Sequence, residues 1–190
     1  MRLGVVDYGA GNLYGLEQAL LEVGATPVTV DVQDGTAAVA RRLMGLSGLI
    51  IPGVGAFDAA AERLNDRGAG ELLRQLAEDG WPLLGICLGF QLLFAGSEEG
   101  ETAASVLRAR PQPAEPAAAE NVSSVGRLGR PPQRGLGLLP GTALLLPQGE
   151  PVPHVGWNTV TWECDAPPVL AGLTPGTPFY FVHSYYLPVP

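Results

Sequence analysis

The chain has 190 residues, of which 46% are hydrophobic, so it can bury one good core, and we expect a single domain over residues 1–190. The formal net charge is −8 and the basic residues form no cluster, which argues against a nucleic-acid partner. No apolar run is long enough to cross a bilayer, and the N-terminus lacks the pattern of a signal peptide. We therefore expect a cytoplasmic protein without a membrane partner.

Reactive side chains are few, and this narrows the possible chemistry. All 11 basic residues are arginines, and the lack of lysine excludes Schiff-base chemistry and a P-loop lysine. The only cysteines are Cys87 and Cys164, which argues against a disulfide scaffold, and no Cys/His spacing indicates zinc. His154 and His183 are the only imidazoles. We expect neither a metal nor a cofactor.

The first half alternates short apolar runs with stretches of helical periodicity. The predicted strands are Arg2–Gly9, Thr26–Asp31, Leu49–Ile51 and Pro82–Ile86. One predicted helix is capped by Asn12 and ended by Gly24, and another ends at Gly80. Strands that are apolar along their whole length indicate a parallel sheet covered on both faces. The fold class is therefore α/β, a mostly parallel central sheet flanked by helices.

The second half has a different composition. Residues Thr102–Arg134 are rich in Ala, Pro and Arg without sustained periodicity, which predicts a long loop or disordered insertion. Alternating, aromatic-rich segments follow, and they predict antiparallel strands at the sheet edge: Ala143–Leu146, Asn158–Glu163 and Pro178–Tyr186. The chain ends directly after the last of these without a closing helix.

Cys87 lies where a buried strand gives way to an apolar helix, between Gly85 and Gly89. This G-x-C-x-G pattern is the cysteine version of the nucleophile elbow, in which a sharp turn exposes the nucleophile. The helix N-terminus would favour the thiolate, and the N–H of Leu88 would receive an oxyanion. Alternatively, Cys87 is a small buried hydrophobe, because five residues with two glycines can arise by chance.

A second glycine-rich segment, Pro52–Phe57 ("PGVGAF"), also follows a strand directly. Its glycines allow a peptide N–H to turn into a pocket, although an ordinary βα turn is the alternative. In a parallel sheet both segments lie at the carboxyl edge, where reactive groups gather. Together they favour acyl transfer with a thiol nucleophile.

Four passages of this sequence resemble class I, triad-type glutamine amidotransferases, and more narrowly the glutaminase subunits of imidazole glycerol phosphate synthases. They are "DYGAGN" (Asp7–Asn12), "IPGVGAF" (Ile51–Phe57), "GICLGFQLLFAGSEEG" (Gly85–Gly100) and the pair "VPHVGWN" (Val152–Asn158) with "YFVHSYY" (Tyr180–Tyr186). The resemblance covers everything except the insertion. It implies a flavodoxin-like amidotransferase fold and an enzyme of histidine biosynthesis.

The resemblance also implies a reaction and a set of site residues. Cys87 would attack the carboxamide of glutamine, release ammonia and leave a γ-glutamyl thioester that water hydrolyses to glutamate. The residues implied to bind glutamine are Gln91, Glu99, Ser184 and Tyr185, with Gly53, Val54 and Gly55 as the oxyanion strand. A carboxylate at Glu99 suits an α-ammonium group, although a solvated helix-end charge is the alternative.

A TIM-barrel cyclase subunit is the implied partner, which would receive the ammonia in a heterodimer. The implied docking residues are Asn12, Trp157 and Asn158. Alternatively, Trp157 is a core residue and His154 a surface residue. His183 is expected to be a structural strand residue, and Cys164 to be incidental.

The resemblance is incomplete in one respect. A triad needs a histidine base held by a glutamate in an H-P-E segment, and this sequence contains none. We therefore expect an incomplete C-terminus and very poor hydrolysis by the chain as given, with recruitment of His183 as the alternative. Two other functions stay open. One is the glutaminase of guanylate or anthranilate synthesis, and the other is a non-catalytic scaffold of the same fold.

Overall fold

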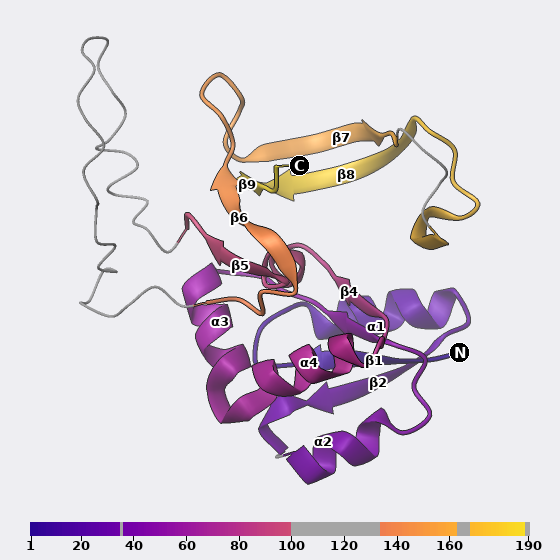
Figure 1. Cartoon of the computed structure of the whole chain (residues 1–190). Helices are drawn as coiled ribbons and strands as arrows, with labels where there is room; N and C mark the ends of the chain where they lie inside the picture. Colours follow the sequence, from indigo (N-terminus) through magenta and orange to yellow (C-terminus); the bar gives the residue numbers. More distant parts are fainter. Residues whose placement is uncertain (35, 100–133, 163–167, 189–190) are drawn as a thin grey trace, which may run out of the picture. The chain divides into compact units, whose positions relative to one another are not determined.

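The computed structural model of the chain describes residues 1–34, 36–99, 134–162 and 168–188. Its described residues fall into two compact units (Figure 1). Unit 1 comprises Met1–Leu144 with Leu187–Pro190, and unit 2 comprises Leu145–Tyr186. Two features predicted from the sequence lie outside the described residues, namely Cys164 and the insertion up to residue 133.

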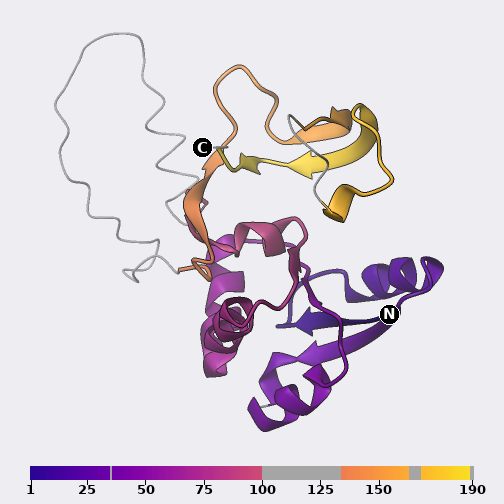
Figure 2. The same cartoon turned by 45° about the vertical axis from the view of Figure 1, so that its right-hand side comes forward.

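Unit 1 is built on a four-stranded parallel sheet of order β2-β1-β3-β4 (Figures 1 and 2). Its strands are β1 (Arg2–Asp7), β2 (Thr26–Asp31), β3 (Leu49–Ile51) and β4 (Leu83–Gly85). The strands hold the β-branched and aliphatic runs of the sequence, which fit a sheet buried on both faces. The predicted α/β class with a mostly parallel sheet is confirmed.

Helices connect these strands. They are α1 (Leu13–Glu22), α2 (Thr36–Leu43), α3 (Phe57–Asn65), α4 (Ala69–Glu78) and α5 (Leu88–Gln91), with 3₁₀ turns at Val32–Asp34 and Asp66–Gly68. Asn12 caps α1 as predicted, because its Oδ1 accepts a hydrogen bond of 3.0 Å from the N–H of Gly15. The sequence did not predict α2 or α3.

Alternation along the strands divides the core between the two faces of the sheet. Val5 of β1 and Ile50 of β3 pack with Leu20 of α1 on one face. Val6 and Ile51, one position further along each strand, belong to the larger cluster formed with α2, α3 and α4. The carboxyl ends of β1, β3 and β4 thus sit on a rigid support, and the loops that follow them form the candidate site.

The segment after α5 differs from the sequence prediction. The apolar run from Leu88 to Phe94 predicts a continuing helix, but α5 is a single turn and the chain forms β5 (Phe94–Ser97). This strand pairs in parallel with β6 (Leu139–Leu145). The prediction was wrong because a continuous apolar run fits a buried strand as well as a buried helix.

Unit 2 contains an antiparallel two-stranded ladder, β7 (His154–Val160) paired with β8 (Thr177–His183). It also holds a 3₁₀ turn (Pro168–Leu170) and the short β9 (Tyr185–Tyr186). Two of the predicted antiparallel segments, Asn158–Glu163 and Pro178–Tyr186, overlap this ladder. The third, Ala143–Leu146, overlaps β6, which pairs in parallel with β5, so its predicted direction was wrong for that pairing. None of the described residues of unit 2 is buried, so this ladder has no hydrophobic interior of its own.

Candidate active site

Cys87 occupies a strained turn between β4 and α5. Its φ is 55°, and it is the only residue other than glycine with a positive φ in the described part of the chain. Strain of this kind persists only where the surroundings impose it, and it gathers at functional sites. The Cys87 side chain is exposed and forms no disulfide. The turn thus presents a free thiol, as the elbow pattern predicts.

The two glycines that flank Cys87 are required by close backbone contacts. A Cβ at Gly85 would collide with the backbone of Phe90, and a Cβ at Gly89 would collide with the carbonyl group of Ile51. Backbone atoms cannot move aside as a flexible side chain can. The pattern therefore reflects the close packing of the elbow against the end of β3.

The loop after β3 lies directly against the elbow. A Cβ at Gly53 would meet the backbone nitrogen of Gly89 at 2.5 Å and the Cβ of Leu88 at 2.8 Å. Leu88 is the first residue of α5, where a backbone N–H has no acceptor within the helix. The structure therefore brings Gly53 beside Leu88, the two segments from which the sequence predicts oxyanion donors.

Beyond Gly53 the same loop is open to solvent. Val54, Gly55 and Ala56 are all exposed, and Gly55 has a φ of 97°. Only glycine adopts this backbone conformation readily. The predicted oxyanion strand thus begins on a packed residue and continues into an exposed stretch.

Tyr8, which the sequence analysis did not single out, lies beneath this loop. Its side chain is fully buried, and its hydroxyl donates a hydrogen bond of 2.6 Å to the carbonyl oxygen of Pro52. Burial raises the pKa of the Tyr8 hydroxyl well above its usual value, and the charge of Cys87 raises it further, while Arg63 lowers it. The sequence could have indicated Tyr8, because it is an aromatic residue with a polar hydroxyl directly after an aliphatic strand.

Gln91 has an unusual environment at the end of α5. Its Oε1 is buried and accepts no hydrogen bond from any described residue. A buried polar atom without a partner is uncommon in folded proteins, and it calls for a ligand or a functional reason. Gln91 is one of the residues that the sequence predicts to bind glutamine, and its free carbonyl fits the amide or ammonium donors of that substrate.

Glu99 is joined to α3 rather than free at the surface. Its Oε2 accepts a hydrogen bond of 2.9 Å from the N–H of Phe57, the first residue of α3. Burial raises the pKa of the Glu99 carboxyl, the Phe57 hydrogen bond lowers it, and the nearby Asp58 raises it. The alternative of a solvated helix-end charge is therefore wrong. The carboxylate caps the N-terminus of α3, which follows the loop after β3.

The remaining predicted substrate residues lie in unit 2. The carbonyl of Ser184 accepts a hydrogen bond of 2.9 Å from Leu146, and the carbonyl of Tyr185 pairs at 2.9 Å with Nδ1 of His183. The other ring nitrogen of His183, Nε2, lies 3.1 Å from Nδ1 of His154. His183 is thus held in a local network, and contact of Ser184 and Tyr185 with the substrate stays a prediction.

The three predicted docking residues have different environments. Asn12 is exposed and caps α1. Trp157 is 72% exposed, so the alternative that it belongs to the core is wrong, and its ring contacts that of Tyr180 with 5.6 Å between centroids. Asn158 lines a pocket of about 250 Å³ with His154 and His183. Because neighbours on a strand point to opposite faces, Trp157 and Asn158 do not share one surface.

A family model for "Glutamine amidotransferase class-I" matches residues 4–187. The chain therefore belongs to the class I glutamine amidotransferases.

Its curated relatives define the type more closely. The chain is 40% identical to "Imidazole glycerol phosphate synthase subunit HisH" of Moorella thermoacetica, over 97% of this chain and 70% of that protein. It is 39% identical to the same subunit of Gloeobacter violaceus, over 97% of this chain and 66% of that protein. It is 40% identical to that of Symbiobacterium thermophilum, over 97% and 69%.

Solved structures agree on the fold. "Structure of PurLQS from Thermotoga maritima" matches with a TM-score of 0.58 and 20% identity, over 97% of this chain and 66% of that one. "Crystal structure of glutamine amidotransferase" matches with a TM-score of 0.52 and 20% identity, over 96% and 70%. At this identity the likeness concerns the fold alone.

Two further features are absent from the described residues. Neither a group of three or more His, Cys, Asp or Glu side chains suited to a metal ion nor a helix long and apolar enough to cross a membrane occurs among them.

Proposed function

We propose that this chain is the glutaminase subunit of an imidazole glycerol phosphate synthase of histidine biosynthesis, acting in the cytoplasm. The observation that carries the proposal is a match to a HisH subunit at 40% identity, over 97% of this chain and 70% of that protein, in a chain whose elbow exposes Cys87. The relatives' names favour this function over the glutaminases of guanylate and anthranilate synthesis. They give no support to the scaffold alternative.

The proposed reaction begins at Cys87. Its Sγ forms a bond to the carboxamide carbon of glutamine, and the π electrons of the C=O move to the oxygen. The N–H of Leu88 and those of the loop from Gly53 to Gly55 stabilise this oxyanion. The C=O re-forms as the C–N bond breaks, and the nitrogen leaves as ammonia with a proton that balances the one lost by the thiol. Water then attacks the γ-glutamyl thioester and releases glutamate and the free thiol.

The residues proposed to bind the substrate are Gln91, Glu99, Ser184 and Tyr185. The buried Oε1 of Gln91 accepts a hydrogen bond from the substrate. Glu99 offers its carboxylate to the α-ammonium group, while Ser184 and Tyr185 close the pocket. Because Glu99 already accepts from the N–H of Phe57, the substrate would use its other lone pairs.

Labelling with the glutamine analogue 6-diazo-5-oxonorleucine tests the nucleophile. We expect one equivalent of label, located by mass spectrometry on Cys87, because the elbow exposes this thiol. Cys164 is the internal control for general thiol reactivity. Label found mainly on Cys164, or protection of neither thiol by excess glutamine, would contradict the assignment.

The proposed partner is a TIM-barrel cyclase subunit bound one to one, so that ammonia passes to its acceptor without release into water. Support comes from the exposed apolar face of the β7–β8 ladder. Trp157 pairs in register with Tyr180, and Val155 with Val182, and all four are more than half exposed. Exposed apolar patches of this kind mark interaction sites.

Single substitutions on the two faces of β7 test this docking. Trp157→Ala should weaken association with the cyclase at least about 30-fold, because aromatic anchors contribute 2 kcal/mol or more to many interfaces. Asn158→Ala on the opposite face is the matched control. Isothermal titration gives both dissociation constants. Equal affinities for wild type and Trp157→Ala would place the interface elsewhere.

The general base is a separate question, because the sequence contains no H-P-E segment. We propose that His183 is structural, since its two ring nitrogens face Tyr185 and His154. Glutamine hydrolysis measured with the cyclase should then be slow and nearly unchanged by His183→Ala. Adding a family-like tail with H-P-E should raise the rate about 10²–10⁴-fold. Fast hydrolysis that His183→Ala abolishes would make His183 the base.

A further inference from the structure

Tyr8 is hydrogen-bonded to a peptide group at the start of the loop after β3, which contains the predicted oxyanion strand. Its hydroxyl donates to the carbonyl oxygen of Pro52 at 2.6 Å, with both groups buried. A trans peptide unit is planar, so its C=O and N–H point in opposite directions. Holding the carbonyl of Pro52 therefore also fixes the direction of the Gly53 N–H, which lies in the same plane on the opposite side of the C–N bond.

The turn that presents Tyr8 is itself fixed on both sides. The N–H of Gly9 donates to Oδ1 of Asp7 at 2.9 Å, and the guanidinium of Arg63 donates to the carbonyl of Gly9 at 2.7 Å. Gly9 has a φ of 81°, which glycine accepts without strain. The two hydrogen bonds of Gly9, together with the burial of the Tyr8 side chain, thus hold Tyr8 in place.

The held peptide lies against the elbow. A Cβ on Gly53 would lie 2.8 Å from the hydroxyl of Tyr8 and 2.5 Å from the backbone nitrogen of Gly89. The next three residues, Val54 to Ala56, are exposed, and Glu99 holds the loop again at Phe57. Tyr8 is therefore the last fixed point before the exposed residues that would contact an oxyanion.

We propose that Tyr8 is a positioning residue for the oxyanion site, and that its hydroxyl orients the Pro52–Gly53 peptide so that the following N–H groups face the tetrahedral intermediate formed on Cys87. The inference rests on the proposed glutaminase function. Tyr8 touches no substrate atom in this account, and it acts only through the loop.

Two electrophiles separate this role from simple packing. The γ-(4-nitrophenyl) ester of glutamate acylates Cys87. The S–C bond forms, an oxyanion develops, and the C–O bond breaks to release 4-nitrophenolate, which departs without a proton and needs no acid. Iodoacetamide alkylates the same thiol by direct displacement of iodide at carbon, with no oxyanion. Only the first reaction depends on the loop.

The ratio of the two rate constants, measured on the full chain, is the test. Tyr8→Phe removes one oxygen and keeps the ring, and we expect it to lower the acylation rate about 10- to 100-fold while alkylation changes little. Tyr14→Phe is the matched control, because Tyr14 is 73% exposed on α1. Cys87→Ala measures the background loss of ester, and mass spectrometry places both products on Cys87.

An unchanged ratio in Tyr8→Phe, or an equal fall in both rates, would overturn the positioning role. If Tyr8→Phe does not fold, Arg63→Met at the protein surface replaces it. A smaller fall in the same ratio supports the proposal, and no fall overturns it. A wild-type chain that iodoacetamide alkylates at Cys87 but the ester does not acylate would overturn the glutaminase function, and this inference with it.

Discussion

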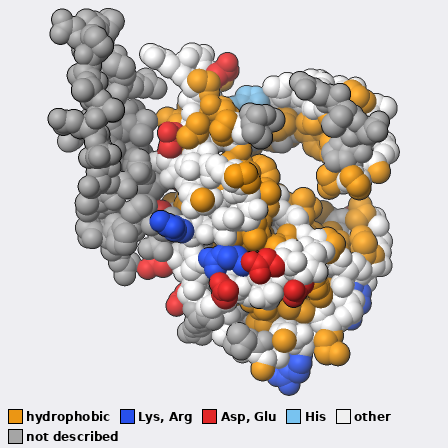
Figure 3. Space-filling view, viewed as in Figure 1, with side chains coloured by type: hydrophobic (Ala, Val, Ile, Leu, Met, Phe, Trp, Pro, Cys, Tyr) orange, Lys and Arg blue, Asp and Glu red, His pale blue; other side chains and the backbone are white. Residues whose placement is uncertain are grey.

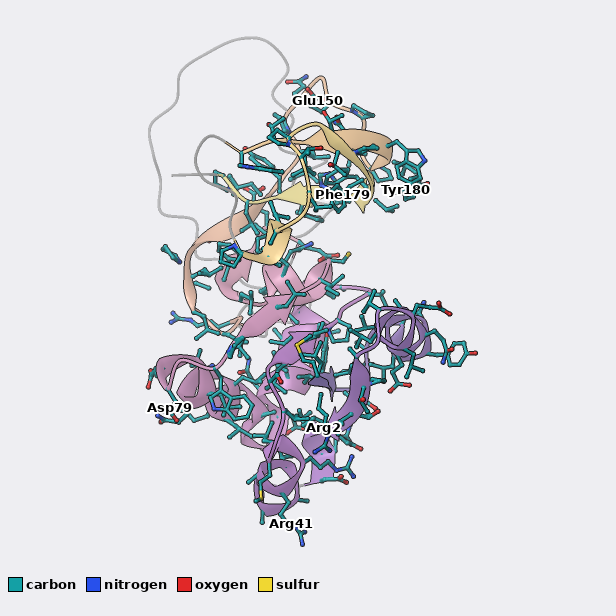
Figure 4. The ribbon with its side chains drawn as sticks, turned by 90° about the vertical axis from the view of Figure 1, so that its right-hand side faces the viewer. Arg2, Arg41, Asp79, Glu150, Phe179 and Tyr180 are labelled. Carbon is teal, nitrogen blue, oxygen red and sulfur yellow. The ribbon has the colours of Figure 1, made fainter. Side chains whose placement is uncertain are left out.

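The two units of this chain differ in where they place their apolar side chains, which are buried in unit 1 and exposed in unit 2. In unit 1, Ile51, Phe57 and Leu64 are completely buried between the sheet and its helices. In unit 2, Trp157 and Val182 belong to a ladder whose described residues include none that is buried. Figure 3 shows the charged side chains gathered mainly over unit 1. Glu150 is the only Asp, Glu or Arg among the described residues of unit 2, and it is labelled in Figure 4.

We expect most of the stability of the chain to reside in unit 1. An isolated two-stranded hairpin is marginal in water, because it has no second layer to bury its side chains. Consecutive residues of β8, such as Phe179 and Tyr180 in Figure 4, belong to opposite faces of the ladder. Unit 1 can therefore support the strained backbone at Cys87, whereas unit 2 offers an uncovered apolar surface.

The largest effect is expected at Gly89, where packing in unit 1 is tightest. Gly89→Ala should destabilise unit 1 by about 3 kcal/mol or more, because the new Cβ meets the carbonyl of Ile51. Urea unfolding measures the change. Gly96→Ala in β5 is the control, since its nearest neighbours would lie at 3.9 Å. A stable, active Gly89→Ala protein would show that the elbow is not packed as described.

A pair of truncations compares the two regions directly. Leu64→Ala should lower the free energy of unfolding by about 2–5 kcal/mol, because it leaves a cavity in the core of unit 1. Val182→Ala should change it by less than about 0.5 kcal/mol, since this side chain is 56% exposed. Equal losses in chemical denaturation would mean that unit 2 has a core of its own.

The two asparagines predicted at the docking surface also differ between the units. Asn12→Ala should cost about 1 kcal/mol, because Asn12 caps α1 through the N–H of Gly15. Within the described part of the chain, the one hydrogen bond to the Asn158 side chain comes from the N–H of its neighbour Thr159 at 2.8 Å, so Asn158→Ala should be nearly neutral. Thermal unfolding of both variants checks this. A larger loss from Asn158→Ala would reverse the comparison.

The smallest effect is a pH dependence in unit 1. Burial is the main cause that raises the pKa of Glu99 above its usual 4.5, so the folded state binds this proton more tightly than the unfolded state. Its contribution to stability is therefore full below pH 4.5 and is lost as pH rises through the raised pKa. Glu99→Gln should remove this part of the loss. Unfolding free energies of both proteins between pH 4 and 7 should diverge, and a constant difference would contradict the expectation.

Much of unit 1 could be predicted from the sequence because local and tertiary preferences agree there. The aliphatic runs of β1 and β3 correctly predicted strands, and Asn12 correctly predicted the start of α1. The helix α3 was missed because its sequence, "FDAAAERLN", has few large apolar residues, and its alanines are buried only by the tertiary fold. The strand β5 was missed because its apolar run also fits a helix.

The candidate site was predictable to a similar extent. The spacing of Gly85, Cys87 and Gly89 predicted the sharp turn and the exposed thiol that the structure shows, and the role of Cys87 as nucleophile stays a prediction. Contacts between distant segments could not be foreseen. Tyr8 and Pro52 are 44 positions apart, and Glu99 and Phe57 are 42 apart. Such pairs depend on register and loop geometry, which no local pattern encodes.

The unpaired carbonyl of Gln91 has a thermodynamic consequence. A buried acceptor without a donor lowers the stability of the empty protein, by about 1–3 kcal/mol for a typical neutral group. A ligand that donates to this oxygen binds only the folded chain, so it raises the free energy of unfolding by RT ln(1 + [L]/Kd). Gln91→Leu should therefore stabilise the ligand-free protein and weaken the binding of a ligand that donates to this oxygen.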